Sequence, residues 1–401
     1  MKLKTTIPLL KDNHNHFSLY AFLYGCPNLQ DITDKSKAVK MINELDKHRV
    51  SVVLGWNSGY YSFTDEEMKT FPPVIIVNLS LHHFIVSKGA EEILKPLYPE
   101  IMTNYMNHKW YEDHFPGMLM FLASIPEPSE DKLGVFLEYM MQKGVYYVED
   151  MLLPNEKVFR VIHQSQYASR TSFWSGLNLF MQLSPEVQRY IPGIKFFTDG
   201  ALGAQTAAIG VPYNDGARGV LLYSDDQLYE MLEKTVSYDK AAAIHAIGEN
   251  ATAQVVRVAE RVKSNGMKFP KLRMEHCQYI KEEDALKAKK LGIILSMQPN
   301  FTTDSVDYKD RLPQEYLETN NPFRMLIDKA GFVPGEDLIF GSDGMPHGVE
   351  YALKASLFPP YPGQKLSIEE FTAAYCMPDQ THGRIHIELD NAWVKCSVEY
   401  R

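Results

Sequence analysis

Short apolar runs alternate with amphipathic stretches through the second half of the chain. The runs are rich in β-branched residues and span Gly193–Gly200, Lys240–Gly248, Lys271–Gln278, Gly292–Asn300 and Asp337–Gly344. The stretches between them have helical periodicity over Ser224–Ser237, Glu249–Asn265, Lys281–Leu291 and Pro322–Ala330. Apolar strands separated by helices are typical of βαβ units around a buried parallel sheet.

Three more strand-like runs bring the count to eight: Leu9–Phe17, Gly144–Met151 and Lys157–Gln164. The later runs end in polar residues that are capable of chemistry. Functional residues at the carboxyl ends of the strands are typical of the α/β class, and eight strands favour a (β/α)8 TIM barrel. An open doubly wound sheet, which also places its site at the strand ends, is the alternative.

The segment between the first and second expected strands is far longer than one crossover helix needs. It contains its own strand-like runs, Val50–Trp56 and Pro73–Leu81, and many aromatic residues. We therefore predict one barrel domain over residues 1–401, with a large insertion after strand 1. The inserted subdomain is expected at Met41–Pro126, on the catalytic face, where its aromatic residues either cap the pocket or form a local core.

Composition excludes several classes of protein. Apolar residues make up 45% of the 401 residues and charged residues 23%, which are globular proportions. The formal net charge is −9 and no Lys/Arg run occurs, so a nucleic acid is not the expected partner. No apolar stretch approaches the roughly 18 residues that span a bilayer, so no membrane partner is expected. The four cysteines lack a Cys-x-x-Cys pair, which favours a reducing, cytoplasmic location.

Histidines and one aspartate form the strongest candidate site. His14 and His16 alternate on a probable strand, so both imidazoles can face the barrel interior and chelate one metal. His245, His276 and Asp343 each end a later strand. Any one of these histidines could be a hydrogen-bonded core residue. Together, at one end of a barrel, they predict a metal site.

Lys195 lies inside an apolar strand, where an unpaired ammonium is costly. One interpretation is an ion pair with Asp199 or Asp343. The other is that the amine has reacted with carbon dioxide to give a carbamate, an anionic ligand that can bridge two divalent metals. The barrel interior would then hold neutral imidazoles, two anions and two metal cations, and the negative and positive charges would offset one another.

The order of motifs resembles the amidohydrolase superfamily, and within it the amidohydrolase-3 (YtcJ-like) group. The matching segments are Asp12–Phe17, Ser80–Ala90, Gly193–Ala208, Ile244–Ala251, Arg273–Ile280, Ser296–Phe301, Pro322–Gly331 and Phe340–Pro346. They follow the family order through nearly the whole chain, and the late motifs are the most specific.

The resemblance implies a binuclear centre. His14, His16 and Asp343 would hold the first metal and His245 and His276 the second, with carbamylated Lys195 as the bridge. His82 aligns with the substrate-facing histidine of the group, and Asp199 and Gln298 align with further residues of the substrate site. Zinc is the default metal for such ligands, and iron, manganese, cobalt or nickel would also fit.

Two departures from the family pattern stand out. The histidine pair comes so early that the N-terminal half of the usual small β-sandwich is absent. The last segment, residues 383–401, alternates like one hairpin with its turn at Asp390-Asn391. The expected fold is thus a barrel with a reduced or missing sandwich, and the exposed apolar surface that this loss should leave favours a homodimer.

These features predict a metal-dependent hydrolase that cleaves an amide or other C–N bond of a small molecule through a metal-bound hydroxide. Asp343 would shuttle the proton from the water to the leaving nitrogen, and His82 would help to polarise the carbonyl. The alternatives at the same site are ester or lactone hydrolysis, deamination of a ring, and a catalytically silent metal-binding barrel. A glycosidase is disfavoured because strand seven ends in Gln298-Pro299, without a carboxylate.

Overall fold

The computed structural model describes residues 3–78, 81, 83–107, 110–111, 114–126, 130–344, 346–390 and 393–401. The chain divides into two compact units. The first comprises Met1–His16 and Leu137–Arg401, and the second is Phe17–Phe136.

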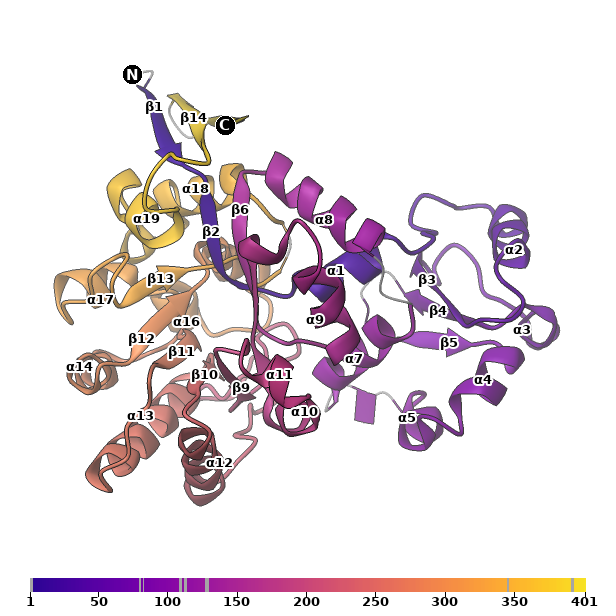
Figure 1. The fold of residues 1–401 in the computed structure, drawn as a ribbon, viewed down its shortest axis with the longest axis horizontal. Helices are drawn as coiled ribbons and strands as arrows, with labels where there is room; N and C mark the ends of the chain where they lie inside the picture. Colours follow the sequence, from indigo (N-terminus) through magenta and orange to yellow (C-terminus); the bar gives the residue numbers. More distant parts are fainter. Residues whose placement is uncertain are drawn as a thin grey trace. The chain divides into compact units, whose positions relative to one another are not determined.

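A closed parallel β-barrel forms the centre of the first unit (Figure 1). Its strands are β2 (Leu10–Asn15), β6 (Val145–Asp150), β7 (Thr171–Phe173), β8 (Ser175–Gly176), β9 (Gly193–Phe197), β10 (Ala241–Ala246), β11 (Leu272–His276), β12 (Ile294–Met297) and β13 (Leu338–Phe340). Only Trp174 separates β7 from β8, so the two act as one interrupted strand. A parallel bridge between Asn15 and Asp343 closes the barrel between β2 and the end of β13. The α/β TIM-barrel prediction is confirmed.

Helices surround these strands in alternation with them. They are α8 (Glu130–Gln142), which crosses the boundary between the units, α9 (Glu156–His163), α10 (Leu177–Gln182), α11 (Pro185–Gln188), α12 (Asp225–Ser237), α13 (Glu249–Ser264), α14 (Glu282–Leu291), α15 (Asp304–Asp307), α16 (Gln314–Thr319), α17 (Phe323–Asp328), α18 (Val349–Leu357) and α19 (Ile368–Tyr375). Three short 3₁₀ turns are η1 (Ala168–Arg170), η2 (Pro299–Thr303) and η3 (Pro362–Gln364).

The strand predicted at Lys157–Gln164 is wrong, because this segment is α9. Val158, Phe159 and Ile162 are buried together on one face, a helical rather than an alternating spacing. The Asn155 side chain caps the helix by accepting from the Val158 amide at 3.1 Å. The third barrel strand is the interrupted β7–β8 pair instead.

Small residues at the base of the barrel make room for Trp174. A side-chain carbon on Gly193 would lie 2.2 Å from the Trp174 ring, closer than van der Waals contact allows. Ala241 and Ala243 of β10 pack with Trp174 and Met151 in one buried cluster. The barrel interior is therefore filled below the polar residues at the strand ends.

A separate antiparallel sheet joins the two ends of the chain. It consists of β1 (Leu3–Pro8), β14 (Gly383–Asp390) and β15 (Trp393–Tyr400), in the order β1-β14-β15. The sequence analysis expected the C-terminal hairpin but not the contribution of β1. Residue 391 of the expected turn lies outside the described residues.

Charged side chains occupy several outward positions of this sheet, beside the half-exposed Trp393. On β14 they alternate with the buried Ile385 and Ile387. Glu399 of β15 contacts Arg384 at 2.9 Å and His386 at 2.8 Å, and hydrogen bonds from these two side chains lower its pKa to about 2. This face of the sheet thus carries a cluster of ion pairs.

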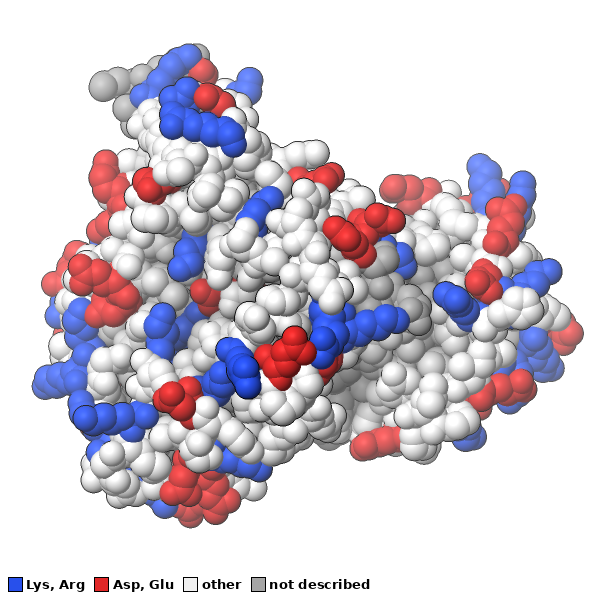
Figure 2. Space-filling model, in the orientation of Figure 1, with Lys and Arg blue, Asp and Glu red and all other residues white. Residues whose placement is uncertain are grey.

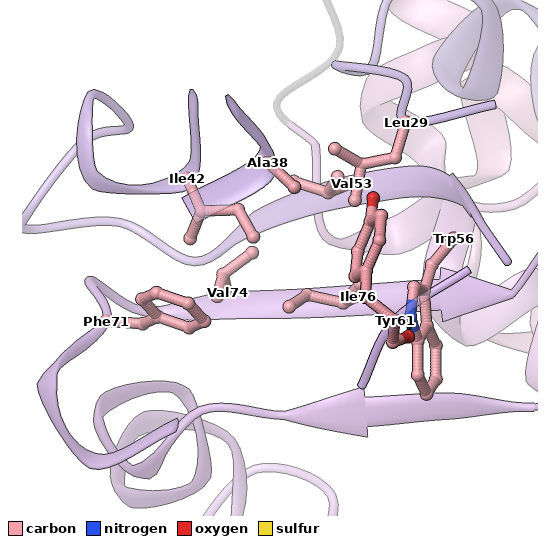
Figure 3. Close-up of a cluster of buried hydrophobic side chains, with 9 residues drawn as sticks. All are labelled: Leu29, Ala38, Ile42, Val53, Trp56, Tyr61, Phe71, Val74 and Ile76. Carbon is pink, nitrogen blue, oxygen red and sulfur yellow. Dashed lines mark hydrogen bonds between the residues drawn. The ribbon is translucent and has the colours of Figure 1, made fainter. Parts of the chain in front are cut away.

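The second unit has a three-stranded sheet and its own core. The strands β3 (Ser51–Trp56) and β4 (Val74–Asn78) are parallel, and β5 (Phe84–Val86) is antiparallel to β4. The helices are α1 (Phe17–Tyr24), α2 (Lys35–Asn43), α3 (Asp65–Thr70), α4 (Lys88–Leu94), α5 (Pro99–Asn104) and α7 (Phe115–Ser124). Figure 3 shows Trp56, Tyr61 and Phe71 packed among aliphatic side chains of this sheet and of α2. These three aromatic residues therefore serve as core.

The bounds of this unit, Phe17–Phe136, are wider than the expected Met41–Pro126, because α1, α2 and the beginning of α8 also belong to it. Figure 2 shows basic and acidic side chains interspersed over the visible face. Within the described part of the chain, every helix is too short or too polar to cross a bilayer.

Candidate metal centre

Three predicted ligands meet at the carboxyl ends of β2 and β13. Nε2 of His14 and Nε2 of His16 lie 3.3 and 3.2 Å from Oδ1 of Asp343. One nitrogen or oxygen from each of the three residues falls within 4.8 Å of the others, as ligands of one ion require. Nε2 of His14 is buried, and apart from this approach to Asp343 it has no polar partner among the described residues, so a bound metal would satisfy it.

Backbone contacts fix the position of Asp343. Its amide donates to the carbonyl of His14 at 2.7 Å, and its φ of 58° lies in the left-handed region. Gly341 is needed here, because a Cβ at this position would lie 2.4 Å from the His14 nitrogen. Against the effect of burial, His14 and His16 lower the pKa of Asp343 well below its usual range. Asp343 is therefore an anion aimed at both histidines.

A carboxylate on β11 orients the ring of His14. Nδ1 of His14 lies 2.6 Å from Oε2 of Glu275, and both side chains are fully buried. Against burial, Arg273 and then His14 lower the pKa of Glu275 well below its usual range, so Glu275 is ionised. An ionised acceptor favours the proton on Nδ1, which leaves Nε2 free to bind a metal.

Arg273 holds Glu275 in place. Its Nε donates to Oε1 of Glu275 at 2.8 Å, and its Nη1 donates to Glu149 on β6 at 2.6 Å. Its Nη2 reaches the Asn13 carbonyl of β2 at 2.7 Å and the Ser296 hydroxyl of β12 at 3.0 Å. This buried guanidinium thus links the strands β2, β6, β11 and β12 close to the candidate metal ligands.

We expect Glu275→Gln to weaken the affinity for a divalent metal by about 10–100-fold, the usual cost of removing an outer partner of a ligating histidine. The glutamine side chain still offers an oxygen that accepts from Nδ1 of His14. It lacks the negative charge that keeps the proton on Nδ1. Competition with a metal-binding dye would measure the change. An unchanged metal affinity would show that Glu275 serves packing alone, and Glu260→Gln, an exposed site on α13, is the matched control.

Two further histidines extend the cluster. The His276 ring lies 4.8 Å from the His14 ring and 4.4 Å from the His245 ring, measured between centroids. Nδ1 of His276 donates to Oε1 of Gln298 at 2.7 Å, and His276 has a φ of 72° that turns it out of the strand alternation. Burial, and then Lys195, lower the pKa of His245 to about 3, and burial, and then His245, lower the pKa of His276 well below its usual range. Both rings are neutral, which is the form that binds metals.

Lys195 is buried inside the barrel, with 3% of its surface exposed. Its Nζ has no hydrogen-bond partner among the described residues, so the ion pair with Asp199 or Asp343 is not formed. Burial lowers the pKa of the amine to about 8, although Glu275 and Asp343 oppose the shift. A buried amine with a lowered pKa, close enough to His245 and His276 to influence both, fits a site that binds a further group.

The other predicted residues have different surroundings. Asp199 is buried and accepts from the amides of Ile247, Gly248 and Ala208 at 2.9–3.0 Å, and burial raises its pKa to about 7. It therefore ties the loop after β9 to the end of β10. Gln298 is also buried and contacts His276. His82 lies outside the described residues.

The sequence placed Glu275 among the polar residues at the strand ends without giving it a role, and it gave no role to Arg273 or Asp12. All three are charged residues in apolar strands, within three positions of a candidate ligand, and this was the available signal. Asp12 accepts from the amide and hydroxyl of Ser342 at 2.9 and 2.6 Å, and burial raises its pKa to about 6. It thereby fixes the turn that presents Asp343.

His347 should make the stability depend on pH. Its Nδ1 lies 3.4 Å from both Asn15 and Ser342, and burial lowers its pKa to about 4. In the unfolded chain His347 binds a proton below about pH 6.5, whereas in the folded chain it does so only near pH 4. The free energy of unfolding therefore falls as the pH drops from about 6.5 to about 4. From pH 7 to 4.5 we expect the wild type to lose about 2–3 kcal/mol more than His347→Gln. Urea unfolding at both pH values tests this, and equal losses would contradict it.

Comparison with known families agrees with this geometry. The model of the amidohydrolase family, Amidohydro_3, matches residues 130–349, which include β6 to β13 and four of the six candidate ligands. The chain belongs to the amidohydrolase family.

Two curated relatives share part of the sequence. YtcJ of Bacillus subtilis (strain 168), whose name describes an amidohydrolase, is 30% identical over 140 residues, 34% of this chain and 26% of YtcJ. Protein LONG AFTER FAR-RED 3 of Arabidopsis thaliana is 32% identical over 124 residues, 29% of this chain and 21% of that protein. The matches thus span about a quarter of the relatives' length.

Solved structures share the fold. An uncharacterized metal-dependent hydrolase from Pyrococcus furiosus superposes with a TM-score of 0.73 at 19% identity and covers 92% of this chain and 80% of that chain. One from Pyrococcus horikoshii OT3 gives a TM-score of 0.70 at 21% identity, with 88% and 74% covered.

Proposed function

We propose that this chain is a metal-dependent hydrolase that cleaves an amide or another C–N bond of a small molecule. The observation that carries the proposal is a pair of buried nitrogens, Nε2 of His14 and Nζ of Lys195, that form no hydrogen bond within the described residues and lie among neutral imidazoles and an ionised Asp343. Burying such atoms without partners is costly unless a bound group satisfies them.

The donor set fits two divalent metal ions. His14, His16 and Asp343 would hold one, and His245 and His276 the other, with the Lys195 amine as a carbamate between them. Zinc is the first choice for imidazole-rich ligands, and iron, manganese, cobalt or nickel would also suit. Bound there, such ions would polarise a substrate carbonyl and lower the pKa of water towards 7.

The protein residues supply proton transfer and orientation. Asp343 accepts the proton of the attacking water and passes it to the leaving nitrogen. We assign His82 to the substrate carbonyl, following the family pattern. Asp199 and Gln298 act by positioning, because their polar atoms already contact the backbone near β10 and the His276 ring.

We further propose that Met41–Pro126 belongs to a cap that shields the substrate, and that the sheet of β1, β14 and β15 is the remnant of a β-sandwich. A cytoplasmic location, which the cysteine pattern favours, and a homodimer remain our proposals.

A substrate panel with metal-loaded and chelated protein tests the function. We expect hydrolysis of at least one N-acyl amine, lost on chelation and restored by metal. Hydrolysis of esters or lactones alone, or release of ammonia from a ring, would replace the proposed substrate class. Tight metal binding without any turnover would support a silent barrel instead.

A further inference from the structure

The segment that follows β12 runs beside the candidate metal centre. Gln298, Phe301 and Asp304 are spaced three residues apart, just before η2, within it and at the start of α15. Oε1 of Gln298 accepts from Nδ1 of His276 at 2.7 Å, and the Phe301 ring stacks on the His276 ring with the centroids 6.0 Å apart. Residues three apart share one side of a tight helical segment, so Asp304 lies on the side that these two contacts turn towards the metal centre.

The Asp304 carboxylate is fixed through one of its oxygens. Its Oδ2 accepts from Nε2 of Gln278 at 2.8 Å, and the same amide nitrogen donates to Asn320 at 3.0 Å. Nδ2 of Asn320 donates in turn to the Phe301 carbonyl at 2.8 Å. Oδ1 of Asp304 accepts no hydrogen bond within the described residues, and it is not among their buried unsatisfied atoms, so part of it is accessible. The carboxylate is therefore held in one orientation with an open acceptor.

Asp304 shares a recess with Asp343. Burial raises the pKa of Asp304 to about 7, and Asp343 is close enough to add to this rise. Both residues nevertheless remain partly exposed, with 24% of the Asp343 side chain accessible. Carboxyl groups that are surrounded by protein and still accessible lie in a depression of the surface. The open oxygen of Asp304 is thus available to a molecule that occupies the metal centre.

The protein supplies no cation for Asp304 within the described residues. The charged side chains that act on its carboxyl group are those of Asp307 and Asp343, and both are acidic. Arg311, on the same segment, donates to the Gly203 carbonyl at 2.6 Å instead. A largely buried carboxylate without a positive partner is costly, so a cationic group of a ligand would be stabilised at this position.

We propose that Asp304 is a substrate-binding residue that selects small amides carrying an ammonium group close to the scissile bond. The ammonium donates to Oδ1 of Asp304, and the partly exposed ring of Phe301 flanks it. A carboxylate and an aromatic ring both attract a positive charge. This inference rests on the proposed hydrolysis, to which it adds a class of substrate.

Calorimetric titration of the zinc-loaded protein with paired hydroxamates, which chelate zinc, tests the proposal without any turnover. One pair is glycine hydroxamate and propionohydroxamate, in which a methyl group replaces the ammonium. The other pair, N-aminoethyl and N-propyl acetohydroxamate, places the charge on the nitrogen side. We expect the amino member of at least one pair to bind about 10–100-fold more tightly, as a charged hydrogen bond allows. Asp304→Asn, which keeps an oxygen for Gln278, should abolish this preference, and the exposed Asp307→Asn should preserve it.

The ratio of the two affinities within a pair isolates the contact with Asp304, because loss of fold or of zinc would weaken both members alike. Equal binding of the two members of each pair by the wild type would overturn the role of Asp304 and leave the metal centre in place. A preference that survives in Asp304→Asn would also overturn it. Failure of every hydroxamate to bind would contradict the metal centre, and the assignment of Asp304 with it. Thermal unfolding and zinc analysis of each variant accompany the titrations.

Discussion

Replacing Asp343 with asparagine is expected to lower kcat/KM by about 10²–10⁴-fold on the first substrate that is found, the usual effect of losing a general base. The carboxylate sits 3.2–3.3 Å from both histidine nitrogens and is ionised, so it can accept a proton that an amide cannot. The change is nearly isosteric, and the backbone bond from residue 343 to the His14 carbonyl does not involve the side chain. Steady-state kinetics with saturating metal would measure the loss.

Asp328→Asn is a suitable control, because that carboxylate lies on α17 with 58% of its side chain exposed. Metal content must be measured in both variants, since Asp343 is also a proposed ligand. Turnover within a few-fold of wild type at full metal occupancy would remove Asp343 from the proton-transfer role.

Replacing His16 with alanine is expected to weaken the affinity for divalent metal by more than about 100-fold, beyond the effect of an outer partner such as Glu275. His16 would be a direct ligand, and alanine offers no donor atom in its place. Its side chain is 19% exposed, so the fold should tolerate the truncation better than a change at the fully buried His14. Dye competition and elemental analysis would report the affinity and the metal content.

His48→Ala in the second unit is the matched control, because His48 is an exposed histidine outside the cluster. If His16→Ala bound metal as tightly as His48→Ala, the assignment of His16 as a ligand would fail.

The long apolar strands were predictable from the sequence, because a strand that is buried on both faces is a continuous run of apolar residues. The expected runs around His245, Glu275 and Ser296 contain β10, β11 and β12. The interrupted β7–β8 strand was not predicted, because its two pieces have three and two residues, too few to show the alternation of a strand. The neighbouring helix α9 was mistaken for a strand because its buried apolar residues form a short dense run.

Contacts between distant positions could not be predicted in this way. The bond between His14 and Glu275 joins residues 261 positions apart, and β1 pairs with β14 across almost the whole chain. Periodicity gives the face of a strand but not its partners, which depend on the closure of the barrel. The sequence predicted that the candidate ligands lie at the strand ends. The buried ion pair of Arg273 and Glu275, which orients His14, was seen only in the structure.

Anomalous diffraction from crystals of the metal-loaded protein tests the central claim most directly. We expect a strong peak within coordination distance of Nε2 of His14, Nε2 of His16 and the Asp343 carboxylate, a second near His245 and His276, and added density on Nζ of Lys195. A map from protein soaked in zinc that shows these side chains ordered, with no anomalous peak among them, would contradict the account.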